Sequence, residues 1–257
     1  HDDIAMDKIF MRRFKREADT LAKLQHPHIV RFYGLKQEGT QVFMLMDCIN
    51  GPSFKKLIYE ARGPMSLRRV LELIRPVCSA LHYAHLRGYV HADIKPANIL
   101  MNDYGQVFLS DFGIARMTDA ATATMVGAGT PAYMSPEQVK GLDPTPLSDI
   151  YSLGIMIFEM LTGGERPFVG DRATVTGSVG EKIRWEQIHQ AAPMPSKYNR
   201  EISKELDEII MKCLEKDPSD RWQTPIELLN SLEMALGKVN IETPEENKQD
   251  NANVVTS

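Results

Sequence analysis

The first fifty residues change from a helical to a strand-like pattern of apolar positions. Residues 5–24 carry apolar side chains at helical spacing with charged residues between them, which predicts an amphipathic helix. Residues 28–37 and 40–49 are rich in β-branched and aromatic side chains. Because Glu38-Gly39 between them suits a turn, these two segments predict a β-hairpin.

The rest of the chain is predicted to be mostly helical. Residues 66–86 should form a long helix that Ser66 caps, Pro76 kinks and Gly88 ends. Residues 149–161 are apolar almost all round, so they predict a buried central helix. Asp149 at the start of this helix could cap it and brace a nearby backbone segment. Two further helices are predicted at 204–216 and at 225–236, the second opened by Thr224-Pro225.

Three segments have weak or no helical pattern. Residues 114–135 are small and polar and predict a functional loop, and residues 171–200 show little periodicity. Residues 237–257 are polar and poor in apolar side chains, which predicts a disordered tail or linker. Short strands are expected at 89–90, 99–101 and 107–109, with a turn at 103–105.

The composition narrows the class of protein. The 257 residues are 43% hydrophobic and 25% charged, the ordinary globular range, and the net charge of −4 gives no sign of nucleic-acid binding. The longest apolar run, 150–161, is too short to span a membrane. Cys48, Cys78 and Cys213 lie in apolar patterns without a paired motif, so we expect buried thiols in the reducing cytoplasm.

The candidate chemistry lies in residues 91–113. This stretch holds Asp93, Lys95 and Asn98 close together and Asp111 further along. Carboxylate and amide oxygens suit Mg²⁺, and a carboxylate is ionised at neutral pH and can accept a proton. Two carboxylates, one amide and one ammonium at these spacings therefore suit a metal–phosphate centre with a general base.

Five motifs place this stretch in a wider pattern. HADIKPAN, DFG, GTPAYMSPE, SDIYSLG and DPSDRW occur in the order and spacing of protein kinases. Over roughly residues 5–236 the sequence resembles the bacterial eukaryotic-like (Hanks-type) serine/threonine protein kinases. The resemblance implies an α+β, two-lobed, protein kinase-like fold. Its kinase domain would cover 1–236, with an incomplete small lobe at 1–46 and a mainly helical large lobe at 50–236.

The resemblance implies ATP and Mg²⁺ as cofactors and protein serine or threonine hydroxyls as substrates. Asp93 would accept or orient the proton of the substrate hydroxyl, and Lys95 would offset charge on the transferred phosphoryl group. Asn98 and Asp111 would hold Mg²⁺. Thr130 would hydrogen-bond the Asp93–Lys95 pair.

The adenine side follows from the same resemblance. Met46 would be the gatekeeper, the backbones of Asp47 and Ile49 would bind adenine, and Leu100 would lie beneath it. Glu17 would be the helix glutamate that pairs with a phosphate-binding lysine.

Supporting contacts are implied as well. Glu137 would form a buried ion pair with Arg221 and so anchor the preceding loop. An apolar spine based on Asp149 would join the two lobes. It would comprise Leu21, Phe32, His91 and Phe112.

The sequence departs from the family pattern in two places. No glycine-rich loop or lysine-bearing strand precedes Glu17, so we expect a fragment that lacks about 40–60 residues of small lobe and binds ATP poorly. Ala92 replaces the arginine of His-Arg-Asp, which in kinases binds a phosphate on the activation loop. Thr122 and Thr124 stand where bacterial relatives autophosphorylate, in a possible kinase dimer, and we expect them to act mainly outside the catalytic centre.

Two other classes fit part of the pattern. A noncatalytic pseudokinase that serves as a binding or scaffold module would explain the missing small-lobe segments, but not the intact Asp93, Asn98 and Asp111. A small-molecule phosphotransferase of the aminoglycoside type shares the Asp/Asn/Asp centre. Such enzymes lack the GTPAYMSPE segment and its Arg221 partner, and both are present here.

Overall fold

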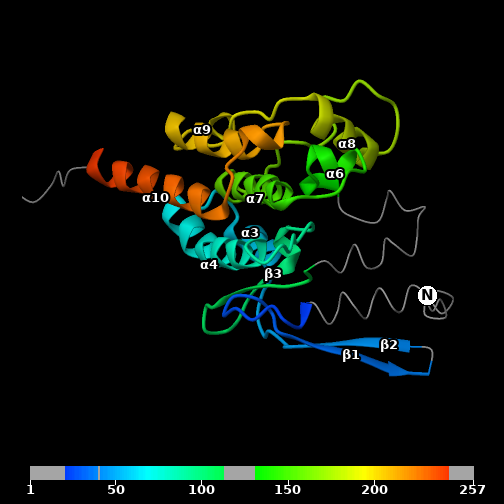
Figure 1. Ribbon diagram of the computed structural model, residues 1–257. Coiled ribbons are helices and arrows are strands. Elements are labelled where there is room, and N and C mark those ends of the chain that lie inside the picture. The colour runs from blue at the N-terminus through cyan, green and yellow to red at the C-terminus, as the bar shows by residue number, and fades with distance from the viewer. Residues whose placement is uncertain (1–20, 40, 113–130, 243–257) are drawn as a thin grey trace, which may run out of the picture.

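The structure, a computed structural model, describes residues 21–39, 41–112 and 131–242 (Figure 1). Most of the predicted 5–24 helix lies outside the described residues, as do Glu17 and residues 243–257. The three threonines singled out above, Thr122, Thr124 and Thr130, lie outside them as well.

The predicted hairpin is present, but its strands are shorter than expected. β1 (Phe32–Glu38) pairs antiparallel with β2 (Gln41–Met46). Residues 28–30 leave the hairpin because they join another strand: Val30 donates its N–H to Leu109 O at 2.9 Å, and Leu109 donates its N–H to His28 O at 2.8 Å. This exchange ties the hairpin to the rest of the molecule.

A second, smaller hairpin carries part of the site. β3 (Ile99–Met101) pairs antiparallel with β4 (Val107–Leu109), and the turn lies at residues 103–105, as predicted. The strand predicted at 89–90 is wrong. The N–H of Tyr89 donates to Ala84 O at 3.0 Å, so this segment closes the end of the preceding helix instead of pairing with a strand.

The long helices form the core, and Figure 1 shows them stacked on the side of the molecule away from β1 and β2. α4 (Leu67–His85) is capped by Ser66, whose hydroxyl accepts from Arg69 N, and it contains Pro76 as predicted. α7 (Pro146–Leu161) is buried along nearly its whole length. α7 packs against α4 and against α9 (Lys204–Cys213), and α4 also packs against α10 (Pro225–Glu242).

Two details of these helices differ from the sequence prediction. α7 begins earlier than expected, and its cap is Thr145, so Asp149 lies in the first turn and does not cap the helix. α10 continues past the predicted end at residue 236 to Glu242, into the segment predicted to be a disordered tail.

The remaining helices are short, and the pattern did not predict them. They are α3 (Phe54–Ala61), α6 (Pro136–Val139) and α8 (Val179–His189), with single 3₁₀ turns η1 (Pro96–Asn98), η2 (Pro131–Tyr133), η3 (Pro195–Lys197) and η4 (Pro218–Asp220). α8 was missed because its apolar positions are sparse, although Ser178 and Glu181 form a capping box at its start.

Gly51 lies where the chain passes from β2 to the helical region. Its φ of 148° suits glycine, and a Cβ built there would meet Met101 O at 1.9 Å. The N–H of Met101 donates to Pro52 O at 2.9 Å, so the backbone of residues 51–52 lies in direct contact with the backbone of β3. No side chain other than the hydrogen of glycine fits at this crossing.

The prediction that all three thiols are buried is partly wrong. Cys78 and Cys213 are buried, but Cys48 is exposed because it lies on the connection after β2, outside the core. All three are free. Within the part of the chain that the structure describes, no helix is long and apolar enough to cross a membrane.

Candidate active site

A buried carboxylate fixes the backbone at the start of the candidate stretch. Asp149 is fully buried in the first turn of α7. Its Oδ2 accepts from His91 N at 2.9 Å and lies 2.8 Å from His85 Nε2, and its Oδ1 accepts from Ala92 N at 2.8 Å. The bracing role predicted for Asp149 is thus present, and the central helix positions the residues next to Asp93.

Asp93, Lys95 and Asn98 meet in one cluster. Lys95 Nζ lies 2.6 Å from Asp93 Oδ2, and Asn98 Nδ2 donates to the same oxygen and to Asp93 O, both at 2.9 Å. The side chains of Asp93 and Lys95 are 28% and 23% exposed, so both can meet a molecule that arrives from solvent. η1 brings Asn98 back onto Asp93 because Asn98 N also donates to Lys95 O at 3.0 Å.

The hydrogen bonds define which oxygens remain available. Asp93 Oδ2 accepts two donors, whereas Asp93 Oδ1 accepts none from the residues that the structure describes. The Nδ2 of Asn98 faces two oxygens of Asp93, which fixes the orientation of the amide and turns its Oδ1 away from Asp93. The cluster therefore offers one carboxylate oxygen to a hydroxyl and one amide oxygen to a metal ion.

Asp111 is joined to this cluster through Ser110. Ser110 donates its N–H and its Oγ–H to Asn98 O at 2.9 and 3.0 Å, and its Oγ lies 3.3 Å from Asp111 Oδ2. Asp111 is exposed and has a φ of 62°, in the left-handed region that non-glycine residues rarely adopt. Such strain is typical of functional sites.

The donor set of Asn98 and Asp111 fits Mg²⁺. Both present oxygen, and Mg²⁺ is usually held by one or two carboxylates together with phosphate and water. No group of three or more histidine, cysteine, aspartate or glutamate side chains suited to a metal ion occurs among the described residues.

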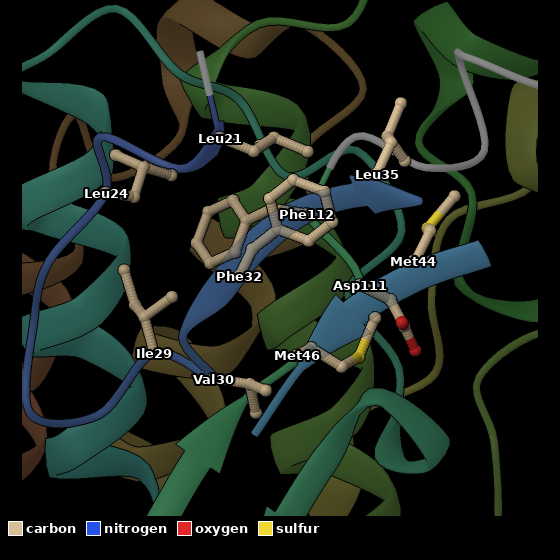
Figure 2. A pocket seen from close by; sticks show the side chains of 10 residues that line it. All are labelled: Leu21, Leu24, Ile29, Val30, Phe32, Leu35, Met44, Met46, Asp111 and Phe112. Atoms are coloured by element: carbon tan, nitrogen blue, oxygen red, sulfur yellow. The ribbon is translucent and has the colours of Figure 1, made fainter. Parts of the chain in front are cut away.

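The predicted spine residues lie in series beside the site. The Phe112 ring lies 4.6 Å from the His91 ring, and His91 Nε2 lies 2.7 Å from Ser110 O. Figure 2 shows Phe112 next to Phe32 and Leu21 in an apolar pocket. His91 in turn is joined to Asp149 through its backbone N–H. These contacts connect the β1–β2 hairpin to α7.

The residues predicted to contact adenine lie at the end of β2, on the connection that follows it and on β3. Met46 lines the pocket of Figure 2 and is 38% exposed, while Leu100 is partly buried on β3. Asp47 donates its N–H to Arg31 O at 2.9 Å, and its carboxylate accepts from Tyr33 Oη at 2.7 Å. Of the two backbone polar groups of Asp47, the N–H is therefore already bonded within the protein. Ile49, partly buried, follows two residues later.

The predicted ion pair between Glu137 and Arg221 is present. Arg221 Nη1 and Nη2 donate to Glu137 Oε1 and Oε2 at 2.8 and 2.9 Å, and Ser148 Oγ donates to Oε1 at 2.7 Å. Burial raises the pKa of Glu137, but the hydrogen bonds from Arg221 and Ser148 outweigh it and lower the pKa to about 2. Glu137 is therefore ionised at neutral pH, and α6 is fixed beside α7.

Three residues that shape the site were not predicted from the sequence. His85 and Ser110 carried no distinctive signal, because a histidine near a helix end and a serine after a strand are both common. Gln138 had one: Ser135 and Gln138 have the spacing of a capping box, and the structure contains that capping box. The contact of Gln138 with Ala92, described below, could not be foreseen from that spacing.

The family model of the protein kinase domain matches residues 2–232. The chain therefore belongs to the protein kinase domain family, and the resemblance noted in its sequence is confirmed. Its relatives include bacterial serine/threonine kinases. It is 35% identical over 234 residues to the serine/threonine-protein kinase PknB of Mycolicibacterium smegmatis, covering 88% of this chain and 36% of that protein.

Two further relatives agree with this assignment. A probable serine/threonine-protein kinase of Streptomyces coelicolor is 36% identical, over 91% of this chain and 35% of its own length. The crystal structure of the Mycobacterium tuberculosis PknI kinase domain superposes with a TM-score of 0.69 at 26% identity, over 91% of this chain and 82% of that chain. The fold is protein kinase-like, as predicted. The chain spans about a third of the length of these two curated relatives.

Proposed function

We propose that this domain transfers the γ-phosphoryl group of ATP to serine or threonine hydroxyls of protein substrates. Asp93 Oδ1 accepts the hydrogen bond of the incoming hydroxyl and orients it, while Lys95 offsets negative charge that develops on the transferred group. The observation that carries this proposal is the cluster in which Lys95 and Asn98 both bond Asp93 Oδ2, while Asp93 Oδ1 accepts no hydrogen bond from the described residues.

Asn98 and Asp111 would hold Mg²⁺, and Met46, Asp47, Ile49 and Leu100 would contact the nucleotide. Mg²⁺ held there would supply positive charge to neutralise the phosphates of ATP. Ser110 links the two residues, because its Oγ lies within hydrogen-bond distance of the backbone oxygen of Asn98 and of Asp111 Oδ2. Thr130 would complete the contacts of the Asp93–Lys95 pair.

The test is Asp93→Asn in the full-length protein, assayed for transfer of labelled phosphate from ATP to a generic protein substrate. Loss of a positioned general base lowers the rate by a factor on the order of 10²–10⁴. Asp103→Asn is the matched control, since Asp103 is exposed in the β3–β4 turn. Transfer by the Asp93→Asn protein at the unmodified rate would show that the assigned base is wrong.

The same samples distinguish a kinase from a noncatalytic scaffold. A kinase should bind Mg²⁺·ATP, shown by an increase in melting temperature, and should also transfer phosphate. A scaffold would give no transfer, with or without binding, and the unmodified and Asp93→Asn proteins would be indistinguishable. Peptides that differ only in a serine, threonine or tyrosine acceptor then test the proposed specificity for serine and threonine.

We also propose autophosphorylation at Thr122 and Thr124 between two copies of the protein. The support is the resemblance to bacterial kinases and the position of both threonines ahead of Thr130. The test mixes unmodified protein with a tagged Asp93→Asn copy in the presence of ATP and maps phosphate on the tagged chain by mass spectrometry. Phosphate at either threonine supports transfer between copies, and its absence from both contradicts it.

Finally, we propose a role in bacterial signalling, with the domain on the cytoplasmic side. The named bacterial relatives and the free thiols Cys78 and Cys213 support this proposal. A fluorescent fusion of the full-length protein, combined with protease accessibility of the domain in intact and opened cells, would test its location.

A further inference from the structure

Ala92, where most kinases have arginine, has an unusual backbone. Its φ is 63°, in the left-handed region, and it is followed directly by the proposed base Asp93. A non-glycine residue adopts this conformation only where the surrounding structure holds it. The contacts of Ala92 therefore show what sets the direction of the backbone at Asp93.

The carbonyl of Ala92 is held by the side chain of Gln138. Gln138 Nε2 donates to Ala92 O at 2.7 Å, across 46 positions of sequence. Gln138 Oε1 accepts from Ser135 N at 3.0 Å and from Ser135 Oγ at 3.1 Å. The opposite amide orientation would put an NH₂ group against the Ser135 N–H and an oxygen against the Ala92 carbonyl, so the network assigns the orientation.

The peptide group between Ala92 and Asp93 is thus held at both ends. Its oxygen accepts from Gln138, and its N–H, which belongs to Asp93, donates to His91 Nδ1 at 3.2 Å. The preceding N–H, of Ala92, donates to Asp149 Oδ1 at 2.8 Å. Rotation of this peptide group would break both of its bonds and would redirect the Asp93 side chain. Of these partners, Gln138 is the one that belongs to α6, which directly follows residues 114–135.

Gln138 itself is attached to a fixed support. It follows Glu137, whose carboxylate binds Arg221 and Ser148, and Arg221 is buried. The backbone oxygen of Glu137 accepts from Leu142 N at 2.9 Å, which closes the turn after α6. The amide of Gln138 is therefore presented to Ala92 by a segment with little freedom to move.

We propose that Gln138 is a positioning residue for phosphotransfer, which holds the Ala92–Asp93 peptide group in its active orientation through the bond to Ala92 O. The inference rests on the proposed function, since Asp93 must be the base. In kinases with arginine at this position, a phosphate on the activation loop contacts that arginine. Here the amide of Gln138 connects the α6 segment to the catalytic segment without any phosphate.

Gln138→Glu tests this role without removing the capping box. A glutamate at this position keeps an oxygen for Ser135 N and Oγ, and glutamate is a normal capping-box partner. An ionised carboxylate has no hydrogen to donate to Ala92 O. We expect kcat to fall about a hundredfold, as for a small displacement of a reacting group, while KM for ATP and the melting temperature stay close to their original values.

The control is Gln106→Glu, which makes the same change of charge at an exposed position of the β3–β4 turn. It should leave kcat unchanged. An unchanged kcat for Gln138→Glu would overturn the proposal. Should that protein fail to fold, Gln138→Met, which removes the donor and introduces no charge, carries the same expectation for kcat.

Amide hydrogen exchange separates this proposal from the proposed function. In the unmodified full-length protein, a peptide that covers residues 91–98 should exchange slowly, and Gln138→Glu should speed its exchange but not that of α4 or α9. No change in that peptide would overturn the proposed contact. If the unmodified protein transferred no phosphate, the function proposed above would fail, while the exchange data would still decide whether Gln138 holds the segment.

Discussion

The helical region and the β1–β2 hairpin contribute opposite sides of the site, and they are packed very differently. α7 is buried along nearly its whole length, and the buried faces of α4 and α9 lie against it. On the hairpin, Tyr33, Phe43 and Leu45 are 57%, 44% and 46% exposed. Asp93, Asn98 and Asp111 belong to the well-packed part, whereas Met46 and Asp47 belong to the weakly packed part.

This difference indicates how stability and chemistry are distributed. A general base and metal ligands must be held to within a fraction of an ångström, which a packed core with buried polar contacts provides. In the proposed function, Met46 and Asp47 contact the nucleotide from the end of a hairpin that has no fully buried residue in either strand. We therefore expect substitutions in the helical region to affect the free energy of unfolding strongly, and those on the hairpin to affect it weakly.

The largest expected effect is that of Glu137→Ala. It leaves the Arg221 guanidinium buried without its partner, and breaking such a buried pair costs about 3–5 kcal/mol. Urea denaturation followed by circular dichroism measures the loss. A loss below about 1 kcal/mol would place this pair with ordinary surface ion pairs and would contradict the comparison.

Next in size is a pair of leucine truncations, one in each region. Leu81 on α4 is 0% exposed, so Leu81→Ala should cost about 2–5 kcal/mol through lost burial and a cavity. Leu45→Ala on β2 removes the same atoms from a side chain that is 46% exposed, and should cost no more than about 1 kcal/mol. If urea denaturation gave equal losses of unfolding free energy for the two variants, the proposed difference in packing between α4 and the hairpin would be wrong.

Acid should remove part of the stability that the Glu137–Arg221 ion pair gives to the helical region. The pKa of Glu137 is lowered from 4.5 to about 2, so its contribution is complete above pH 4.5 and disappears as pH falls toward 2. Linkage gives a loss of about 3 kcal/mol over that interval. The measurement is the difference in unfolding free energy between the unmodified protein and Glu137→Gln at several pH values. A difference that did not shrink on acidification would contradict it.

The smallest effect is expected from Glu233→Ala. Its partner Arg75 lies 2.7 Å away, but the two side chains are 39% and 57% exposed. Water screens such a pair, so the loss should be about 0–1 kcal/mol and should decrease further in high salt. A loss as large as that of Glu137→Ala would show that burial is not what separates the two ion pairs.

Local features of the fold could be predicted, because their causes lie within a few residues. Ser66 and Thr224-Pro225 mark helix starts, and Thr224 Oγ1 accepts from Glu227 N at 3.1 Å. The turn between β3 and β4 was also foreseen. The burial of Cys48 was predicted wrongly because a short apolar pattern does not show whether a strand continues to that residue.

Contacts across long sequence separations could be predicted only through the resemblance. Glu137 and Arg221 are 84 positions apart, and nothing in either neighbourhood specifies the other. The motifs did indicate them, along with Asp93, Asn98 and Asp111. Gln138 and Ala92 belong to no such pairing, so their contact emerged only from the way α6 and the catalytic segment pack together. The start of β1 was likewise decided by a tertiary contact, the pairing of residues 28–30 with Leu109.

The crossing at Gly51 has a mechanical consequence. After the hairpin, the backbone of the chain contacts the backbone of Met101 here, and no side chain lies between the two. A Cβ at this position would force the two backbones apart, and the φ of Gly51 is one that other residues rarely adopt. We therefore expect Gly51→Ala to displace the connection after β2 from β3 and to lower the melting temperature of the protein.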